Sequence, residues 1–192
     1  MRSTDLEDRA ADSLEFIRAT MARSASFTVV PGWGGVGMGV VGLMAAAGAS
    51  RAPDRRAWLT IWLLAAVAAG SVGLVTLHRK ARRHHVAIWS ASGRRFLQGF
   101  LPALVAGAIL TAALVRMGAF DALPPAWLLL YGAGVLAGAT SSVPVLTWLG
   151  IALMGLGGAA SLVNGFGDLW LGAGFGALHV VFGSLVARRH GG

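Results

Sequence analysis

The stretch ALPPAWLLLYGAGVLAGATSSVPVLTWLGIALMGLGGAASLVNGFG, residues 122–167, decides the fold. It separates Asp121 from Asp168 by 46 residues without a single Asp, Glu, Lys or Arg. One helical crossing of a bilayer needs about 20 apolar residues, so the stretch is too long for a single span. Turn-forming residues lie near its middle: Thr140, Ser141, Ser142 and Pro144. We therefore expect two transmembrane helices here, near residues 125–140 and 144–163.

The same character extends over the whole chain. Of its 192 residues 56% are hydrophobic and 12% charged, and the mean hydropathy is +0.68. A soluble domain of this length could not hide so much apolar surface in one core. Further uncharged stretches predict spans near residues 28–49, 57–77, 96–115 and 169–187. The predicted fold class is all-α, a polytopic integral membrane bundle of six transmembrane helices that form one domain over residues 27–190.

Prolines and tryptophans agree with these limits. Pro31, Pro102 and Pro144 are expected to open the first, third and fifth helices, where a missing N–H is tolerated. Tryptophans are expected in interfacial belts, four of them at the outer ends: Trp58, Trp62, Trp127 and Trp170.

Residues 1–26 differ from the rest, because they hold five of the eight acidic residues and no apolar segment. Thr4 and Glu7 fit a capping box, and apolar residues then recur at helical spacing: Leu6, Ala10, Leu14, Ile17 and Met21. We expect an amphipathic helix on the cytoplasmic membrane surface, and no signal peptide.

Lys and Arg residues predict the orientation. With the N-terminus inside, twelve lie on cytoplasmic segments and four outside, which places both termini in the cytoplasm. The expected inner loop 78–95 carries six of them: Arg79, Lys80, Arg82, Arg83, Arg94 and Arg95. The positive-inside rule explains these charges, and binding of anionic lipid headgroups is the alternative. Basic residues that flank spans do not predict nucleic acid as a partner. Fifteen arginines against one lysine favour a bacterial inner membrane.

Glycines are expected to mark helix contacts. Small residues on one helix face allow close backbone approach, and nine glycines lie on such faces: Gly32, Gly35, Gly39, Gly42, Gly134, Gly138, Gly172, Gly176 and Gly183. Because such grooves bind neighbouring helices, they predict a homo-oligomer or a membrane partner subunit. The alternative for the first span is that Pro31-Gly32-Trp33-Gly34-Gly35 unwinds to expose carbonyl groups.

The last span carries the ionisable residues of interest. Asp168, Gly172, Gly176, His179 and Gly183 are spaced four, four, three and four, so a regular helix places them on one face. His179 follows Asp168 by eleven residues and should lie about 16 Å deeper, near the middle of the membrane. An ionisable group there predicts function. The structural alternative is a neutral His179 that bonds a backbone carbonyl or a hydroxyl group such as that of Tyr131.

No motif for catalysis is present. Without cysteine there is no thiol nucleophile or thiolate metal site, and the histidines predict neither a metal site nor a haem, since His179 alone lies deep. We expect no cofactor. The leading hypothesis is a non-enzymatic accessory or sensory subunit that assembles through its glycine grooves. The alternative is a small-solute or ion channel or transporter, with Asp168 at the outer mouth and His179 and Tyr131 along the path.

Overall fold

The computed structural model describes residue 13 and residues 31–83, 89–163 and 165–190. The regular elements of these ranges are helices, in the order α2 (Gly32–Ala49), α3 (Arg55–Arg83), α4 (Ala91–Arg116), η1 (Phe120–Ala122), α5 (Leu123–Ala139), α6 (Pro144–Leu162), α7 (Gly167–Leu171), η2 (Gly172–Leu178) and α8 (His179–His190). The last three are continuous and are called the C-terminal helix below. In this described part of the chain six helices are long and apolar enough to cross a membrane, as predicted. The amphipathic helix expected over residues 1–26 lies, apart from Ser13, outside the described residues.

Prolines open two of the helices, and of these Pro144 was predicted to do so. Pro144 begins α6, and Pro124 lies in the first turn of α5. The Asp54 carboxylate accepts hydrogen bonds of 2.8 Å from the backbone N–H groups of Arg56 and Ala57, which have no partner within the first turn of α3.

Helices α3 and α4 are longer than predicted. α3 continues to residue 83 instead of ending near 77, and α4 begins at residue 91 instead of 96, so most of the expected loop 78–95 is helical. Basic side chains stabilise the last turn of α3, and the Ser90 hydroxyl caps α4 by accepting from the Gly93 N–H over 3.2 Å. Because α4 starts early, Pro102 lies inside the helix and does not open it.

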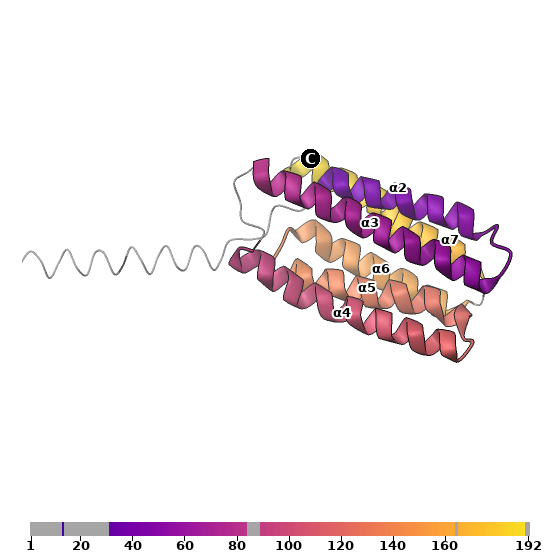
Figure 1. The fold of residues 1–192 in the computed structure, drawn as a ribbon. Helices are drawn as coiled ribbons and strands as arrows, with labels where there is room; N and C mark the ends of the chain where they lie inside the picture. Colours follow the sequence, from indigo (N-terminus) through magenta and orange to yellow (C-terminus); the bar gives the residue numbers. More distant parts are fainter. Residues whose placement is uncertain (1–12, 14–30, 84–88, 164, 191–192) are drawn as a thin grey trace, which may run out of the picture.

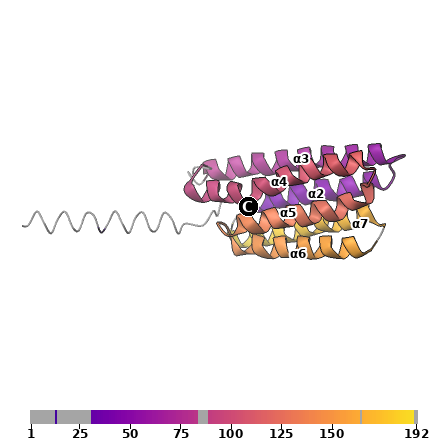
Figure 2. The same ribbon diagram turned by 90° about the horizontal axis from the view of Figure 1, so that it is seen from below.

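The helices form an elongated bundle in two groups. α2 packs against α3 on one side and the C-terminal helix on the other, while α5 packs against α4 and α6. Figure 1 shows these groups along opposite edges, and Figure 2 shows α3 and α4 on one side of the bundle with α6 on the other. α3 and α4 follow one another in the chain, yet each packs on its own group and not closely on the other.

Glycine brings α2 and the C-terminal helix into backbone contact. A Cβ atom on Gly39 would lie 2.7 Å from the carbonyl oxygen of Gly176, and one on Gly42 would lie 2.6 Å from that of Phe175. From the other side, a Cβ on Gly183 would lie 2.6 Å from the backbone nitrogen of Val36. The glycine stripe of α2 is therefore filled by another helix of the same chain.

The C-terminal helix is not a regular α-helix. Its segment η2 is a π-helix, with hydrogen bonds between residues five apart. The segment contains Gly172, Gly174 and Gly176, and glycine has little intrinsic preference for the tighter α-helical turn. The prediction that Asp168 through Gly183 share one face assumed α-helical spacing and is wrong. With the π-helical turn, Gly176 and Gly183 face α2, whereas His179 bonds Tyr131 of α5.

The two ends of the bundle differ in charge. The basic end, where α2 begins and α8 ends, carries Arg79, Lys80, Arg82, Arg83, Arg94, Arg95, Arg188 and Arg189 and no acidic residue among those described. The mixed-charge end, where α3 and α7 begin, carries Arg51, Asp54, Arg55, Arg56, Arg116, Asp121 and Asp168.

Candidate functional site

His179, the first residue of α8, uses both ring nitrogens in hydrogen bonds. Nδ1 lies 3.0 Å from the carbonyl oxygen of Gly174, and Nε2 lies 3.0 Å from the hydroxyl oxygen of Tyr131 on α5. A carbonyl only accepts, so Nδ1 carries the proton. His179 is 5% exposed, and no acidic residue of the described ranges bonds it, so a charged ring would be costly. The ring is therefore neutral, and Nε2 accepts a hydrogen bond from the Tyr131 hydroxyl group.

The π-helix explains the bond to Gly174. Because residues five apart lie one turn above another in this geometry, the Gly174 carbonyl lies below the His179 side chain. Position 174 has no room for a larger residue, since a Cβ there would lie 2.3 Å from the Leu128 side chain of α5. The local backbone thus selects the His179 tautomer.

Aromatic rings hold Tyr131 in place. Its ring meets Phe100 of α4 edge to face at 5.6 Å and 80°, and Phe175 of η2 at 5.2 Å and 88°. Such arrangements are the preferred ones for aromatic pairs. The hydroxyl group of Tyr131 is therefore directed by contacts from two other helices.

A cleft of about 380 Å³ opens beside this pair, between α3 and α4. We call it the α3–α4 cleft. Alanine, leucine and glycine of α3 and α4 form its walls, and residues of α2, α5 and η2 close its inner side. Leu63 and Leu104 line opposite walls and are 46% and 38% exposed, so the cleft opens on the flank of the bundle. Five polar side chains line it: Trp62, Thr111, Trp127, Tyr131 and His179.

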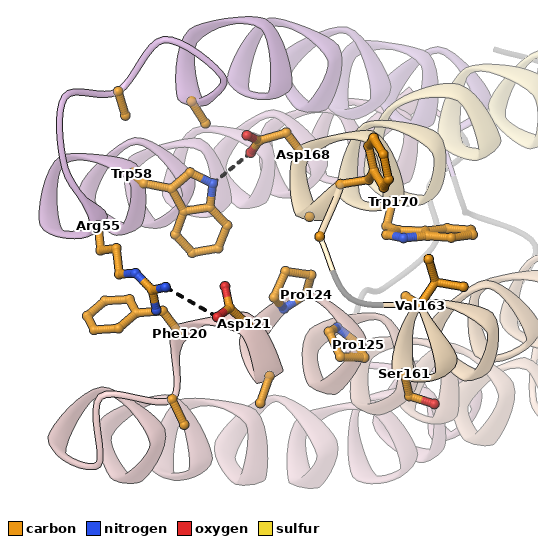
Figure 3. A pocket seen from close by; sticks show the side chains of 18 of the residues that line it. Arg55, Trp58, Phe120, Asp121, Pro124, Pro125, Ser161, Val163, Asp168 and Trp170 are labelled. Atoms are coloured by element: carbon orange, nitrogen blue, oxygen red, sulfur yellow. Dashed lines mark hydrogen bonds and ion pairs between the residues drawn. The ribbon is translucent and has the colours of Figure 1, made fainter.

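A second pocket, of about 850 Å³, lies at the mixed-charge end among the loops that join the helices (Figure 3). Asp168 lines it and accepts hydrogen bonds from the indole N–H groups of Trp58, over 2.7 Å, and Trp62, over 3.0 Å. Across the pocket Arg55 forms an ion pair of 3.3 Å with Asp121. Asp168 therefore joins the C-terminal helix to α3.

Indole rings lie between the two cavities. Trp58 lines the pocket, Trp127 lines the cleft, and their rings stack at 5.8 Å with an angle of 9°. Of the residues that the structure describes, none lines both cavities. Asp168 and His179, which share one path in the permeation hypothesis, face separate cavities in this structure.

The predicted glycines lie at helix contacts. Seven of them lie between α2 and the C-terminal helix: Gly32, Gly35, Gly39, Gly42, Gly172, Gly176 and Gly183. The other two, Gly134 and Gly138, lie on α5 against phenylalanines of α4, Phe100 and Phe96.

The residues expected at lipid headgroups differ in their exposure. Arg79, Arg82, Arg83, Arg94 and Arg95 are exposed at the basic end. Lys80 is buried, with 6% of its surface exposed, and its headgroup role stays a prediction. Its neighbour Ala81 is also buried, with 3% of its surface exposed.

Sequence reasoning missed the inward tryptophans. Trp62, expected in an interfacial belt, is 4% exposed and bonds Asp168, and Trp127 donates to the Thr111 hydroxyl over 2.8 Å. The spacing of four between Trp58 and Trp62 places both indole rings on one helix face, so the sequence could have predicted that they share a hydrogen-bond acceptor.

Comparisons with known proteins assign no family. No family model, curated protein or solved structure matches the chain. Function must therefore be inferred from the two cavities. Among the described residues no three His, Cys, Asp or Glu side chains lie close enough to hold a metal ion. The chemistry available at the α3–α4 cleft is apolar contact together with a few directed hydrogen bonds.

Proposed function

We propose that this chain is a non-enzymatic integral membrane protein, an accessory or sensory subunit, whose α3–α4 cleft binds a lipophilic small molecule from the bilayer. The observation that carries the proposal is the cleft itself. It is apolar, it opens on the flank of the bundle and it has a hydrogen-bonded Tyr131–His179 pair on its inner side.

Residence in a membrane is supported by the outward surface of the long helices. Leu64 and Val67 of α3 and Ile109 of α4 are 64%, 68% and 67% exposed, within helices long enough to cross a bilayer. An apolar surface of this extent is stable only in apolar surroundings. The charge difference between the ends favours the basic end in the cytoplasm, and we propose a bacterial inner membrane as the location.

Size and lining of the cleft suit a small molecule. Its volume of 380 Å³ lies in the range of ligand sites, about 300–1,000 Å³, and such sites combine apolar walls with a small number of placed polar groups. Since the opening faces the flank near the middle of α3 and α4, a ligand would enter from the hydrocarbon region. Water-soluble compounds would not reach this opening.

Assembly through the glycine grooves and permeation, the two modes of action drawn from the sequence, receive less support. Assembly through the α2 glycines would require a surface that the C-terminal helix already fills. Permeation past Asp168 and His179 would require Trp58 and Trp127 to separate, because their stacked rings lie between the two cavities. Ligand binding requires neither change.

The test uses the full chain in lipid nanodiscs with a photoactivatable long-chain fatty alcohol. Peptide mapping after illumination should find the probe on the walls of the cleft. Ala66→Trp, which fills the cleft from α3, should remove this labelling, whereas Ala68→Trp, on the same helix but outside the cleft lining, should not. Labelling spread evenly over exposed helix faces, and equal in both variants, would exclude the cleft as a binding site.

A further inference from the structure

Every side-chain N–H and O–H group that lines the α3–α4 cleft already has an acceptor within the protein. The Trp62 indole donates to Asp168 over 3.0 Å, and the Trp127 indole donates to the Thr111 hydroxyl oxygen over 2.8 Å. The Thr111 hydroxyl group in turn donates to the carbonyl oxygen of Gly107 over 2.7 Å. None of these protons is left for a ligand.

The protons of the Tyr131–His179 pair are also donated within the protein. Nδ1–H of His179 donates to Gly174, so the neutral ring has only a lone pair on Nε2, and this lone pair takes the Tyr131 hydroxyl proton. The Tyr131 oxygen donates its one proton and keeps an unused lone pair. A hydroxyl group that already donates is also a better acceptor, because linked hydrogen bonds polarise one another.

We infer that the ligand of the cleft is a lipid with a free hydroxyl group, which donates its hydrogen bond to the Tyr131 oxygen. This inference rests on the proposed function and names the ligand class. Lipids that carry only ether, ester or ketone oxygens can accept but not donate, so they would place an acceptor against an acceptor. A hydroxyl group in the hydrocarbon region has no water to bond, and Tyr131 offers it a partner.

Thr111 is the other acceptor on the lining, but its oxygen already donates one hydrogen bond and accepts one. The Tyr131 oxygen has one bond only among those observed. Tyr131 also lies beside His179 on the inner side of the cleft, where an elongated molecule that enters between α3 and α4 would end.

The experiment compares two competitors of the photoactivatable alcohol in nanodiscs: hexadecanol and its methyl ether, which has the same chain but no donor. A single neutral hydrogen bond predicts that the alcohol competes about 3- to 10-fold better than the ether. Equal competition by both would overturn the inference and leave binding in the cleft intact. Absence of cleft labelling, or labelling that Ala66→Trp does not remove, would instead contradict the proposed function.

A variant tests the direction of the Tyr131 bond. In His179→Leu the Tyr131 hydroxyl group loses its internal acceptor and can donate to an ether oxygen. The ether should then compete nearly as well as the alcohol, because its own competition improves. Thr111→Val should keep the wild-type preference, and a preference lost in Thr111→Val but kept in His179→Leu would contradict the assignment to Tyr131. If His179→Leu does not fold, the wild-type comparison decides by itself.

Discussion

Tyr131 and His179 are 48 residues apart in the sequence, and their polar atoms lie 3.0 Å apart. The bond joins α5 to the C-terminal helix, and its direction follows from the second bond of the ring, to Gly174. A π-helical turn thus determines which ring nitrogen is protonated, and the tautomer determines that Tyr131 donates. The ligand preference that we propose depends on this short chain of bonds.

Removal of the Tyr131 hydroxyl group should expose the cost of an unpaired buried nitrogen. Tyr131→Phe should lower the free energy of unfolding by about 1–3 kcal/mol, because Nε2 of His179 loses its donor. A double-mutant cycle with His179→Leu should give a coupling of similar size, because the double variant has no unpaired nitrogen. Unfolding in mixed micelles measures both. Strictly additive single variants would show that the bond contributes nothing to stability.

The contact between α2 and the C-terminal helix should not accept a methyl group. Gly39→Ala places a Cβ 2.7 Å from the Gly176 carbonyl oxygen, so the helices must move apart, at a cost of about 1–3 kcal/mol. Thermal unfolding in detergent measures the loss.

Gly155 on α6 is the matched control, since a Cβ there would meet nothing within 4 Å. Gly155→Ala should leave stability equal or raise it by up to about 1 kcal/mol, because alanine prefers a helix. Equal melting temperatures of the two variants would contradict the close contact.

Asp168 should matter more than Asp121, although both line the same pocket. Asp168→Asn removes the charge that accepts two indole N–H groups, and a charged hydrogen bond exceeds a neutral one by about 1–2 kcal/mol. Asp121→Asn breaks an ion pair whose side chains are 59% and 78% exposed, which predicts a change of about 0–1 kcal/mol. Denaturation of both variants side by side gives the comparison. A larger loss for Asp121→Asn would refute the role of Asp168 in holding α3.

The proposed orientation has a direct test, because the chain has no cysteine of its own. Arg55→Cys at the mixed-charge end should react with a membrane-impermeant thiol reagent in intact cells, and Arg94→Cys at the basic end should react only after lysis. Both side chains are exposed in the structure, so burial within the protein would not explain a cysteine that fails to react. The reverse pattern would invert the orientation.

Sequence alone determined the number of long apolar helices and most of their limits, because these depend on local properties. Charged residues and prolines end or open a helix wherever the chain folds, and a run of 46 uncharged residues needs a turn in its middle. The same local rules placed His179 deep in the last helix and named Tyr131 as one possible partner. These rules failed at the start of α4, where two helix-start signals compete. The Ser90 cap begins the helix at residue 91, so Pro102, which was expected to open it, lies inside.

Only the tertiary structure decided which faces meet. In the bilayer that we propose for this chain, the hydrophobic effect does not favour one apolar helix face over another, so steric fit and hydrogen bonds would select the neighbours. That selection filled the α2 glycine stripe with the C-terminal helix, turned Trp62 inward onto Asp168 and left α3 and α4 apart. The α3–α4 cleft and its acceptor lining result from these contacts between segments that are far apart in the sequence. Local sequence patterns predict single helices, so they could not predict a cleft that several helices form together.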